Sequence, residues 1–157
     1  MNTPTQLKAR FPYQFEGKHL GLSFAKGWFP AFTKLCADID AALGEDKQGF
    51  QWDQIKEKFG WARYYYLCDL DGKPPTRFDL FSESGLTLAA AAGKSKDPIF
   101  TEINRLIDEA ETATKHTCIH CGKPGANSNQ KGYYLVECEH HRGVDSRVSP
   151  YFEDGES

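Results

Sequence analysis

Four residues near the C-terminus have the types and the spacing of a zinc site. Cys118 and Cys121 are separated by two residues, and Cys138 and His141 repeat that separation after a spacer of 16 residues. Thiolates and imidazoles are donors that Zn²⁺ prefers, and two such pairs can supply the four corners of a tetrahedron. We therefore predict that Cys118, Cys121, Cys138 and His141 bind zinc. His140 is the alternative fourth ligand, although a single residue separates it from Cys138, which is a less usual spacing.

Four protein ligands leave a zinc ion no open position for water or substrate. The predicted metal is therefore structural, and its binding should help segment 118–141 to fold. A catalytic metal would need only three ligands, with His140 acting as a base. His116 and His120 are expected to be solvated neighbours. The two other cysteines, Cys36 and Cys68, are expected to be free thiols in a reducing compartment, the cytoplasm.

Two enzyme classes with related motifs fit the sequence poorly. Zinc deaminases carry a His-x-Glu and a Pro-Cys-x-x-Cys motif, but Thr117 precedes Cys118 and no histidine of this chain has glutamate two residues later. HNH-type nucleases share the Cys-x-x-Cys-Gly element and an acidic-His-His element. They also need a downstream asparagine and histidine, and Arg142–Ser157 contains neither. A degenerate nuclease is the weakest of the alternatives.

The composition is that of a globular protein. The chain has 157 residues, of which 39% are hydrophobic and 13% aromatic, enough for one domain with a core. No apolar run is long enough to span a bilayer and no secretory signal precedes the domain, so no membrane association is expected. The formal net charge of −3 gives no general attraction to nucleic acid, although it leaves room for a local basic face.

Residues 1–117 are predicted to form an α+β core, an antiparallel sheet with covering helices. A helix near 30–43 has Pro30 in its first turn and Gly44 as its C-terminal cap. A second helix near 98–115 has Asp97 as its N-cap and Pro98 as its first residue. Both helices have an apolar stripe, formed by Phe32, Leu35, Cys36, Ile39 and Leu43 in the first and by Ile99, Ile103, Leu106, Ile107, Ala110 and Ala113 in the second.

Residues 50–68 are predicted to form a β-hairpin, with strands near 50–58 and 61–68 and Gly60 in the turn; a helix over 51–59 is the competing local prediction. Residues 1–18 are expected to be irregular. Residues His19–Ala25, which follow them, show a weak strand signal. Within the segment 69–97, the sequence indicates a turn at 71–75, a short strand at 77–81, either a helix or a buried strand at 86–92, and a surface loop at 93–96. The zinc knuckle, 118–141, should pack on the core because the second helix runs directly into it, and the tail, 142–157, is expected to be flexible.

The hairpin is also a candidate binding surface because it mixes basic and aromatic residues. A base-stacking or protein-docking face is one interpretation. The other is that the aromatic rings fill the core while the charges are solvated, and aromatic strand residues are mostly core. The candidate residues are Lys56, Lys58, Arg63, Tyr64 and Tyr66.

Four stretches, taken together, resemble a group of small uncharacterised bacterial and phage proteins. They are Gly27–Pro30 (GWFP), Ile55–Tyr65 (IKEKFGWARYY), Cys118–Gly125 (Cys-x-x-Cys-Gly-x-Pro-Gly) and the pair Cys138-x-x-His141. That group combines a Gly-Trp-aromatic-Pro helix start and a Lys-Glu-Lys-Phe-Gly hairpin with a C-terminal Cys/His zinc knuckle. This chain has Trp61-Ala62 where Gly-Leu is typical, and a longer 69–97 segment. The resemblance implies this fold, a bound zinc and a bacterial or mobile-element setting.

The sequence therefore predicts a non-enzymatic zinc-binding protein that acts by binding another macromolecule. A protein partner is favoured, with the chain serving as an inhibitor or accessory factor in a bacterial or phage setting of the anti-defence or immunity type. The alternatives are a nucleic-acid-binding protein that uses the knuckle and the basic-aromatic hairpin, and the degenerate HNH-type nuclease.

Overall fold

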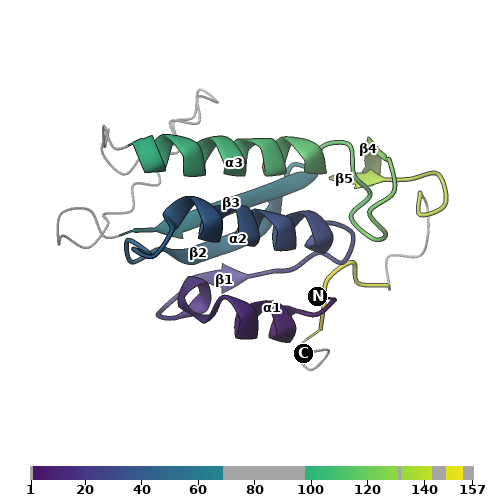
Figure 1. The fold of residues 1–157 in the computed structure, drawn as a ribbon. Helices are drawn as coiled ribbons and strands as arrows, with labels where there is room; N and C mark the ends of the chain where they lie inside the picture. Colours follow the sequence, from purple (N-terminus) through teal and green to yellow (C-terminus); the bar gives the residue numbers. More distant parts are fainter. Residues whose placement is uncertain (1, 69–97, 131, 143–147, 154–157) are drawn as a thin grey trace.

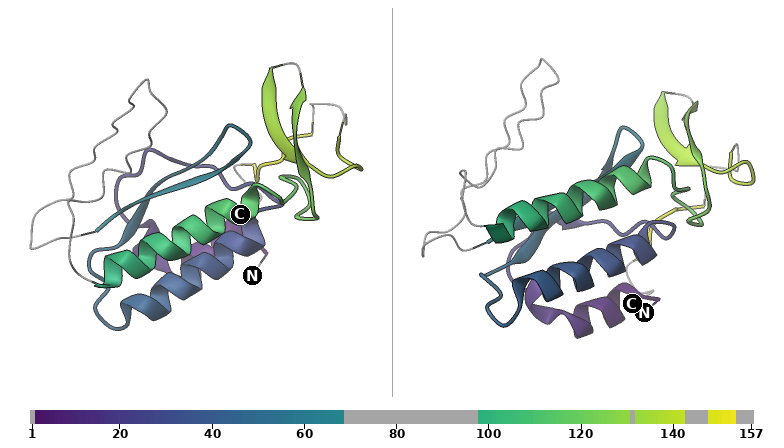
Figure 2. Two further views of the ribbon diagram at one scale, coloured as in Figure 1. Left: turned by 90° about the horizontal axis from the view of Figure 1, so that it is seen from above. Right: turned by 45° about the horizontal axis from the view of Figure 1, so that its top comes forward.

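The protein has the predicted α+β fold, seen here in a computed structural model that describes residues 2–68, 98–130, 132–142 and 148–153. Two helices lie side by side on one face of a three-stranded sheet, and a separate two-stranded ribbon stands at one end (Figures 1 and 2). No described helix is long and apolar enough to cross a bilayer. Predictions for Asp97 and for 69–97 lie outside the described residues. The elements are α1 (Pro4–Arg10), the 3₁₀ helix η1 (Pro12–Phe15), β1 (Gly21–Leu22), α2 (Phe29–Leu43), β2 (Gln51–Lys58), β3 (Trp61–Leu67), α3 (Pro98–Thr114), β4 (Ala126–Gln130) and β5 (Tyr133–Glu137).

The three-stranded sheet is mixed, which corrects the prediction of an antiparallel sheet. β2 and β3 form the predicted antiparallel hairpin, but β1 pairs with β2 in parallel, with Gly21 opposite Gln54. The alternation of apolar residues that marks a strand carries no information about its direction. The hairpin turn consists of Phe59 and Gly60, whose φ angles of 56° and 96° are both positive. This is the two-residue turn whose twist matches a hairpin.

The core lies between the helices and the sheet. Phe32 of α2 packs on the rings of Trp52 and Tyr64, each at a centroid distance of 5.1 Å. The predicted stripe of α2 is buried throughout. α3 buries Phe100, Ile103 and Ile107, whereas Ala113, at the end of its predicted stripe, is exposed.

α3 also covers the edge of β3 with polar side chains. Glu111 accepts a hydrogen bond from the backbone N–H of Tyr64 at 2.8 Å, and the hydroxyl of Thr114 accepts one from Ala62 at 3.0 Å. Arg63 forms an ion pair with Glu111 at 3.3 Å. An open sheet edge invites pairing with other chains, and these contacts protect it while fixing the end of α3 beside the hairpin turn.

The N-terminal residues are ordered, which corrects the expectation of an irregular segment. Thr3 caps α1 by accepting a hydrogen bond from the N–H of Gln6, and Pro4 occupies the first helical turn. The segment is then held by Gln14 of η1, which is fully buried. The side chain of Gln14 donates to the carbonyl of Cys36 at 2.9 Å and accepts from the indole N–H of Trp52 at 3.1 Å.

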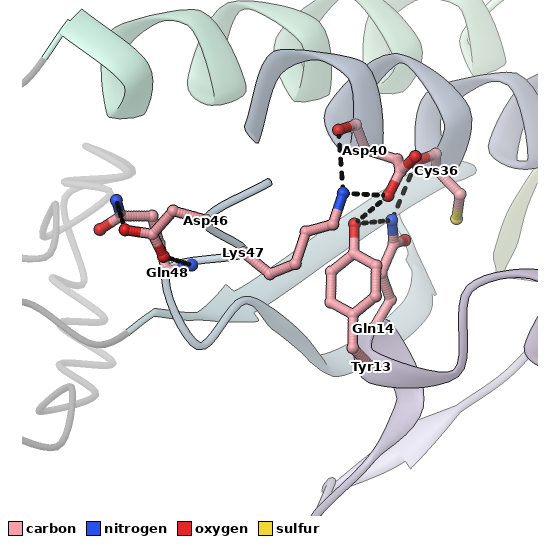
Figure 3. Close-up of polar contacts among 7 residues, drawn as sticks. All are labelled: Tyr13, Gln14, Cys36, Asp40, Asp46, Lys47 and Gln48. Carbon is pink, nitrogen blue, oxygen red and sulfur yellow. Dashed lines mark hydrogen bonds and ion pairs between the residues drawn. The ribbon is translucent and has the colours of Figure 1, made fainter. Parts of the chain in front are cut away.

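A polar network extends from Gln14 to the surface (Figure 3). Gln14 also donates to the Tyr13 hydroxyl at 3.0 Å, and that hydroxyl donates to Asp40 at 2.9 Å. Lys47 completes the network with an ion pair to Asp40 at 2.7 Å. The Lys47 ammonium group and the Tyr13 hydroxyl lower the pKa of Asp40, although partial burial opposes the shift. The network ties η1 to α2 and β2.

Gln14→Ala should lower the free energy of unfolding by about 1–3 kcal/mol, because it leaves the buried indole N–H of Trp52 without its acceptor. Chemical denaturation monitored by circular dichroism measures the loss. Gln6→Ala is the matched control. Gln6 is exposed on α1, and its side-chain oxygen accepts a hydrogen bond from the N–H of Asn2, which is also exposed. Equal stability of the two variants would show that the network contributes nothing.

The described part of the tail, residues 148–153, packs on the core and corrects the expectation of a flexible tail there. Tyr151 pairs with Ala25, the carbonyl of Pro150 accepts from Lys26 at 2.7 Å, and the Phe152 ring lies 5.0 Å from that of Phe29. These contacts place the tail beside the start of α2.

Candidate metal centre

The four predicted ligands lie together at the base of the β4–β5 ribbon. Cys118 and Cys121 come from the turn after α3, and Cys138 and His141 from the turn after β5. Their ligand atoms all lie within 4.8 Å of one another. Each pair sits on a tight turn: the carbonyl of Cys118 accepts from Gly122 at 2.9 Å, and that of Cys138 accepts from His141 at 3.0 Å.

Three separations between the ligand atoms are close to those of a tetrahedral site with sulfur and nitrogen ligands. The Sγ atoms of Cys121 and Cys138 are 3.8 Å apart. Nδ1 of His141 lies 3.5 Å from Sγ of Cys118 and 3.3 Å from Sγ of Cys138. Tetrahedral Zn–S and Zn–N bonds of normal length imply S···S and S···N separations of about 3.8 and 3.5 Å. The group could therefore hold one metal ion of this kind.

His141 supplies the fourth donor atom in this arrangement, and His140 does not. The His140 side chain is exposed and contacts the His141 ring edge-on, at a centroid distance of 5.6 Å. The group of possible ligands therefore contains His141 alone of the two histidines.

The thiol of Cys138 is already biased toward the form that binds metal. Desolvation raises its pKa, but hydrogen bonds from the side chain and backbone of His141, with further help from Cys121 and Cys118, outweigh that effect and lower the pKa to about 6. Desolvation and the neighbouring thiols raise the pKa of Cys121. A divalent cation would displace the remaining thiol protons, as thiolate ligation requires.

A second set of residues, which sequence reasoning missed, surrounds the ligands. The His120 ring stacks on the His141 ring at 4.9 Å and its Nε2 lies 3.4 Å from Oε1 of Glu137, so His120 is not the solvated neighbour expected. Glu137 is buried and accepts from the Ser128 hydroxyl at 3.2 Å. Glu137 thus holds the His120 ring, which in turn packs on the His141 ring. Only the position of His120 between two ligands could have indicated this role.

The candidate metal centre packs directly on the start of α2. The N–H of Gly27 donates to the carbonyl of Ile119 at 2.8 Å, and the indole N–H of Trp28 donates to the carbonyl of Thr117, also at 2.8 Å. A Cβ atom on Gly27 would lie 2.1 Å from the carbonyl oxygen of Cys118. The Gly-Trp pair before α2 is therefore the docking point of the knuckle.

The five hairpin residues predicted as a binding surface do not share one face. Tyr64 is 5% exposed in the core, and Tyr66 is partly buried, stacked on Phe50 at 5.1 Å. Lys56 lies opposite Arg63 and belongs with Lys58 to the other face. Since side chains alternate along a strand, the tyrosines fill the core and the basic residues lie on the far side. The two tyrosines therefore cannot form one surface with the three basic residues.

Comparison of the chain with protein-family models, with curated proteins and with solved structures finds no match. What the arrangement supports by itself is a metal-binding group of three cysteines and one histidine, packed against an α+β core.

Proposed function

We propose that this chain is a non-enzymatic zinc protein that acts by binding a partner protein, as an inhibitor or accessory factor. The observation that carries the proposal is the set of four donor atoms within 4.8 Å of one another. Four protein ligands complete the coordination of zinc, so the ion would stabilise structure and would not meet a substrate.

The choice of zinc rests on the donor set. Three sulfur atoms and one imidazole nitrogen suit Zn²⁺, whereas calcium and magnesium prefer oxygen ligands. The S···S separation of 3.8 Å and the lowered pKa of Cys138 both favour a thiolate-bound ion.

The proposal of a protein partner is supported by the ribbon that the metal would hold. Tyr133 and Tyr134 of β5 are 76% and 48% exposed, and the ribbon projects beyond the ends of the helices (Figure 2). Tyrosine combines a large apolar ring with a polar tip and is enriched at protein interfaces. A two-stranded ribbon is marginally stable alone, so a metal at its base would keep these rings displayed.

The bacterial or phage setting is proposed from the resemblance of the four sequence stretches alone. A reducing, cytoplasmic location is proposed from the cysteines. None of the five cysteines forms a disulfide; Cys36 and Cys68 are buried, and the sulfurs of the other three belong to the possible metal-binding group.

Affinity capture from a nuclease-treated bacterial lysate tests the proposal. The tagged wild-type chain should retain a dominant protein that survives the nuclease. The double variant Tyr133→Thr, Tyr134→Thr should lose it, because threonine suits a strand but removes the rings.

Leu20→Ser is the matched control, since Leu20 is also exposed, at 64%, but lies before β1. It should retain the same protein. The proposal fails if every captured protein disappears with the nuclease, or if the double variant captures the same protein as the wild type.

A further inference from the structure

The face of the β2–β3 hairpin that points away from the buried Ala62 and Tyr64 alternates cations with aromatic rings. We call it the hairpin outer face; its cross-strand pairs are Lys56 with Arg63 and Lys58 with Trp61, and Tyr65 follows on β3. The Lys56 ammonium lies 5.2 Å from the centre of the Tyr65 ring, and the Arg63 guanidinium lies 4.6 Å from that of Trp61.

Two neighbouring residues extend this face at the turn. Lys115, exposed just after α3, places its ammonium group 5.0 Å from the Trp61 ring centre. The Phe59 ring lies 6.5 Å from the Trp61 ring, with the Lys58 ammonium 5.4 Å from its centre. Four cations and three rings therefore converge around one end of the hairpin, although the whole chain carries a net charge of −3.

Phe59 is an unfavourable residue for its position. Its φ angle of 56° lies in the left-handed region, where a two-residue turn favours Asn or Gly over an aromatic residue. Its ring is 60% exposed, so the unfavourable backbone is not compensated by burial in the core. Strained backbone positions cluster at active sites and ligand contacts.

We propose that the hairpin outer face, with Phe59 and Lys115, binds single-stranded nucleic acid. Rings that stack on bases, together with cations that contact phosphates, are the elements of such sites. Unpaired bases are required because bases within a duplex do not offer their faces. When the strand binds, a base stacks on a ring face that a cation now covers. The displaced cation then contacts the neighbouring phosphate group.

The cations favour nucleic acid over a protein as the occupant of this face. Three of the four are lysines, which are depleted at protein interfaces but make ordinary phosphate contacts. The inference goes beyond the protein partner proposed above and uses a different set of side chains.

Fluorescence anisotropy with a fluorescein-labelled (dT)₂₀ strand and the full, zinc-loaded chain tests this site. The wild type should bind, and the logarithm of its affinity should fall with the logarithm of salt concentration with a slope of about −2, since the three lysines can contact phosphates while Arg63 stays paired with Glu111. Lys58→Gln should weaken binding and make the slope shallower by about 0.7. Lys34→Gln, the same change on exposed α2 surface, should alter neither quantity.

Phe59→Asn separates the role in binding from a role in folding. Asparagine suits the left-handed turn, so the melting temperature should stay the same or rise. Affinity for (dT)₂₀ should fall about 5- to 150-fold, the range for losing one stacked base, with an unchanged salt slope.

Three results would overturn the inference. They are no binding of (dT)₂₀ at low salt by the folded, zinc-loaded chain, equal affinity of the wild type and Phe59→Asn, and tighter binding of a 20-base-pair duplex that Phe59→Asn leaves unchanged. None of these results would contradict the proposed protein partner, because the capture experiment uses different variants and a nuclease-treated lysate.

Discussion

Cys138→Ser should empty the metal centre and unfold the β4–β5 ribbon while the sheet and α2 stay folded. Cys138 follows β5 directly, and its sulfur lies against both Cys121 and His141. Structural zinc supplies about 10–16 kcal/mol of apparent binding free energy in small zinc modules, far more than a two-stranded ribbon contributes by itself. The core should persist because the rings of Phe32, Trp52 and Tyr64 pack together without any metal ligand.

Metal analysis and hydrogen exchange measure the two parts of this prediction. The purified wild type should contain about one zinc per chain, and Cys138→Ser should contain none. Amides of β4 and β5 should exchange rapidly in the variant, while those of β2 and β3 remain protected.

Cys36→Ser controls for the chemistry of the substitution. Cys36 is fully buried and does not belong to the ligand group, and burial raises the pKa of its thiol. This variant should lose some stability but keep its zinc and its protected ribbon. A full equivalent of zinc in Cys138→Ser would show that the assigned ligand set is wrong.

The features that the sequence predicts well are those that depend on local spacing. The grouping of Cys118, Cys121, Cys138 and His141 follows from two tight turns, and the hairpin follows from Gly60 between two strand-forming runs. The buried stripe of α2 likewise follows from the helical period. In each case neighbours in the sequence decide the outcome.

The features that the sequence predicts poorly depend on contacts between distant segments. The parallel pairing of β1, the burial of Gln14 and the contact of Tyr151 with Ala25 each join residues far apart in the chain. Thr3 and Pro4 are an exception, since a capping residue followed by proline is a local signal for the start of α1. That signal could have been used.

For the hairpin, the local sequence pattern predicts only part of the arrangement. Period two correctly separates Tyr64 from Arg63, but it does not say which face the helices cover. The structure places α2 over the Tyr64 face, so the basic residues share the other face with Trp61 and Tyr65. Tyr64 and Tyr66 therefore lie on the covered face and do not share a surface with Lys56, Lys58 and Arg63.

Gly27→Ala should destabilise the whole protein, because Gly27 is where the metal centre meets the core. The added Cβ would lie 2.1 Å from the carbonyl oxygen of Cys118 and 2.7 Å from the backbone nitrogen of Gly122. Both are backbone atoms next to metal ligands, so neither can rotate away as a side chain could. The knuckle or the start of α2 must shift, which should also strain the hydrogen bond from Trp28 to Thr117.

The expected loss is about 3 kcal/mol of unfolding free energy, at the upper end of the range for overpacking a rigid site. In a chain of this length, that corresponds to a fall of about 6–12 °C in the melting temperature. Zinc should also pass faster to a competing chelator, because the turn of Cys118 and Cys121 is displaced. Thermal unfolding by circular dichroism and a chelator-competition assay measure the two effects.

Gly21→Ala makes the same chemical change where there is room for it, since no heavy atom lies within 4 Å of the position that its Cβ would take. Its melting temperature and rate of zinc release should stay close to those of the wild type, because isolated surface changes usually alter stability by less than about 0.5 kcal/mol. If Gly27→Ala melted and released zinc as Gly21→Ala does, the knuckle would not be docked at Gly27. The Gly-Trp pair before α2 would then need an explanation other than close approach of the metal-binding turn.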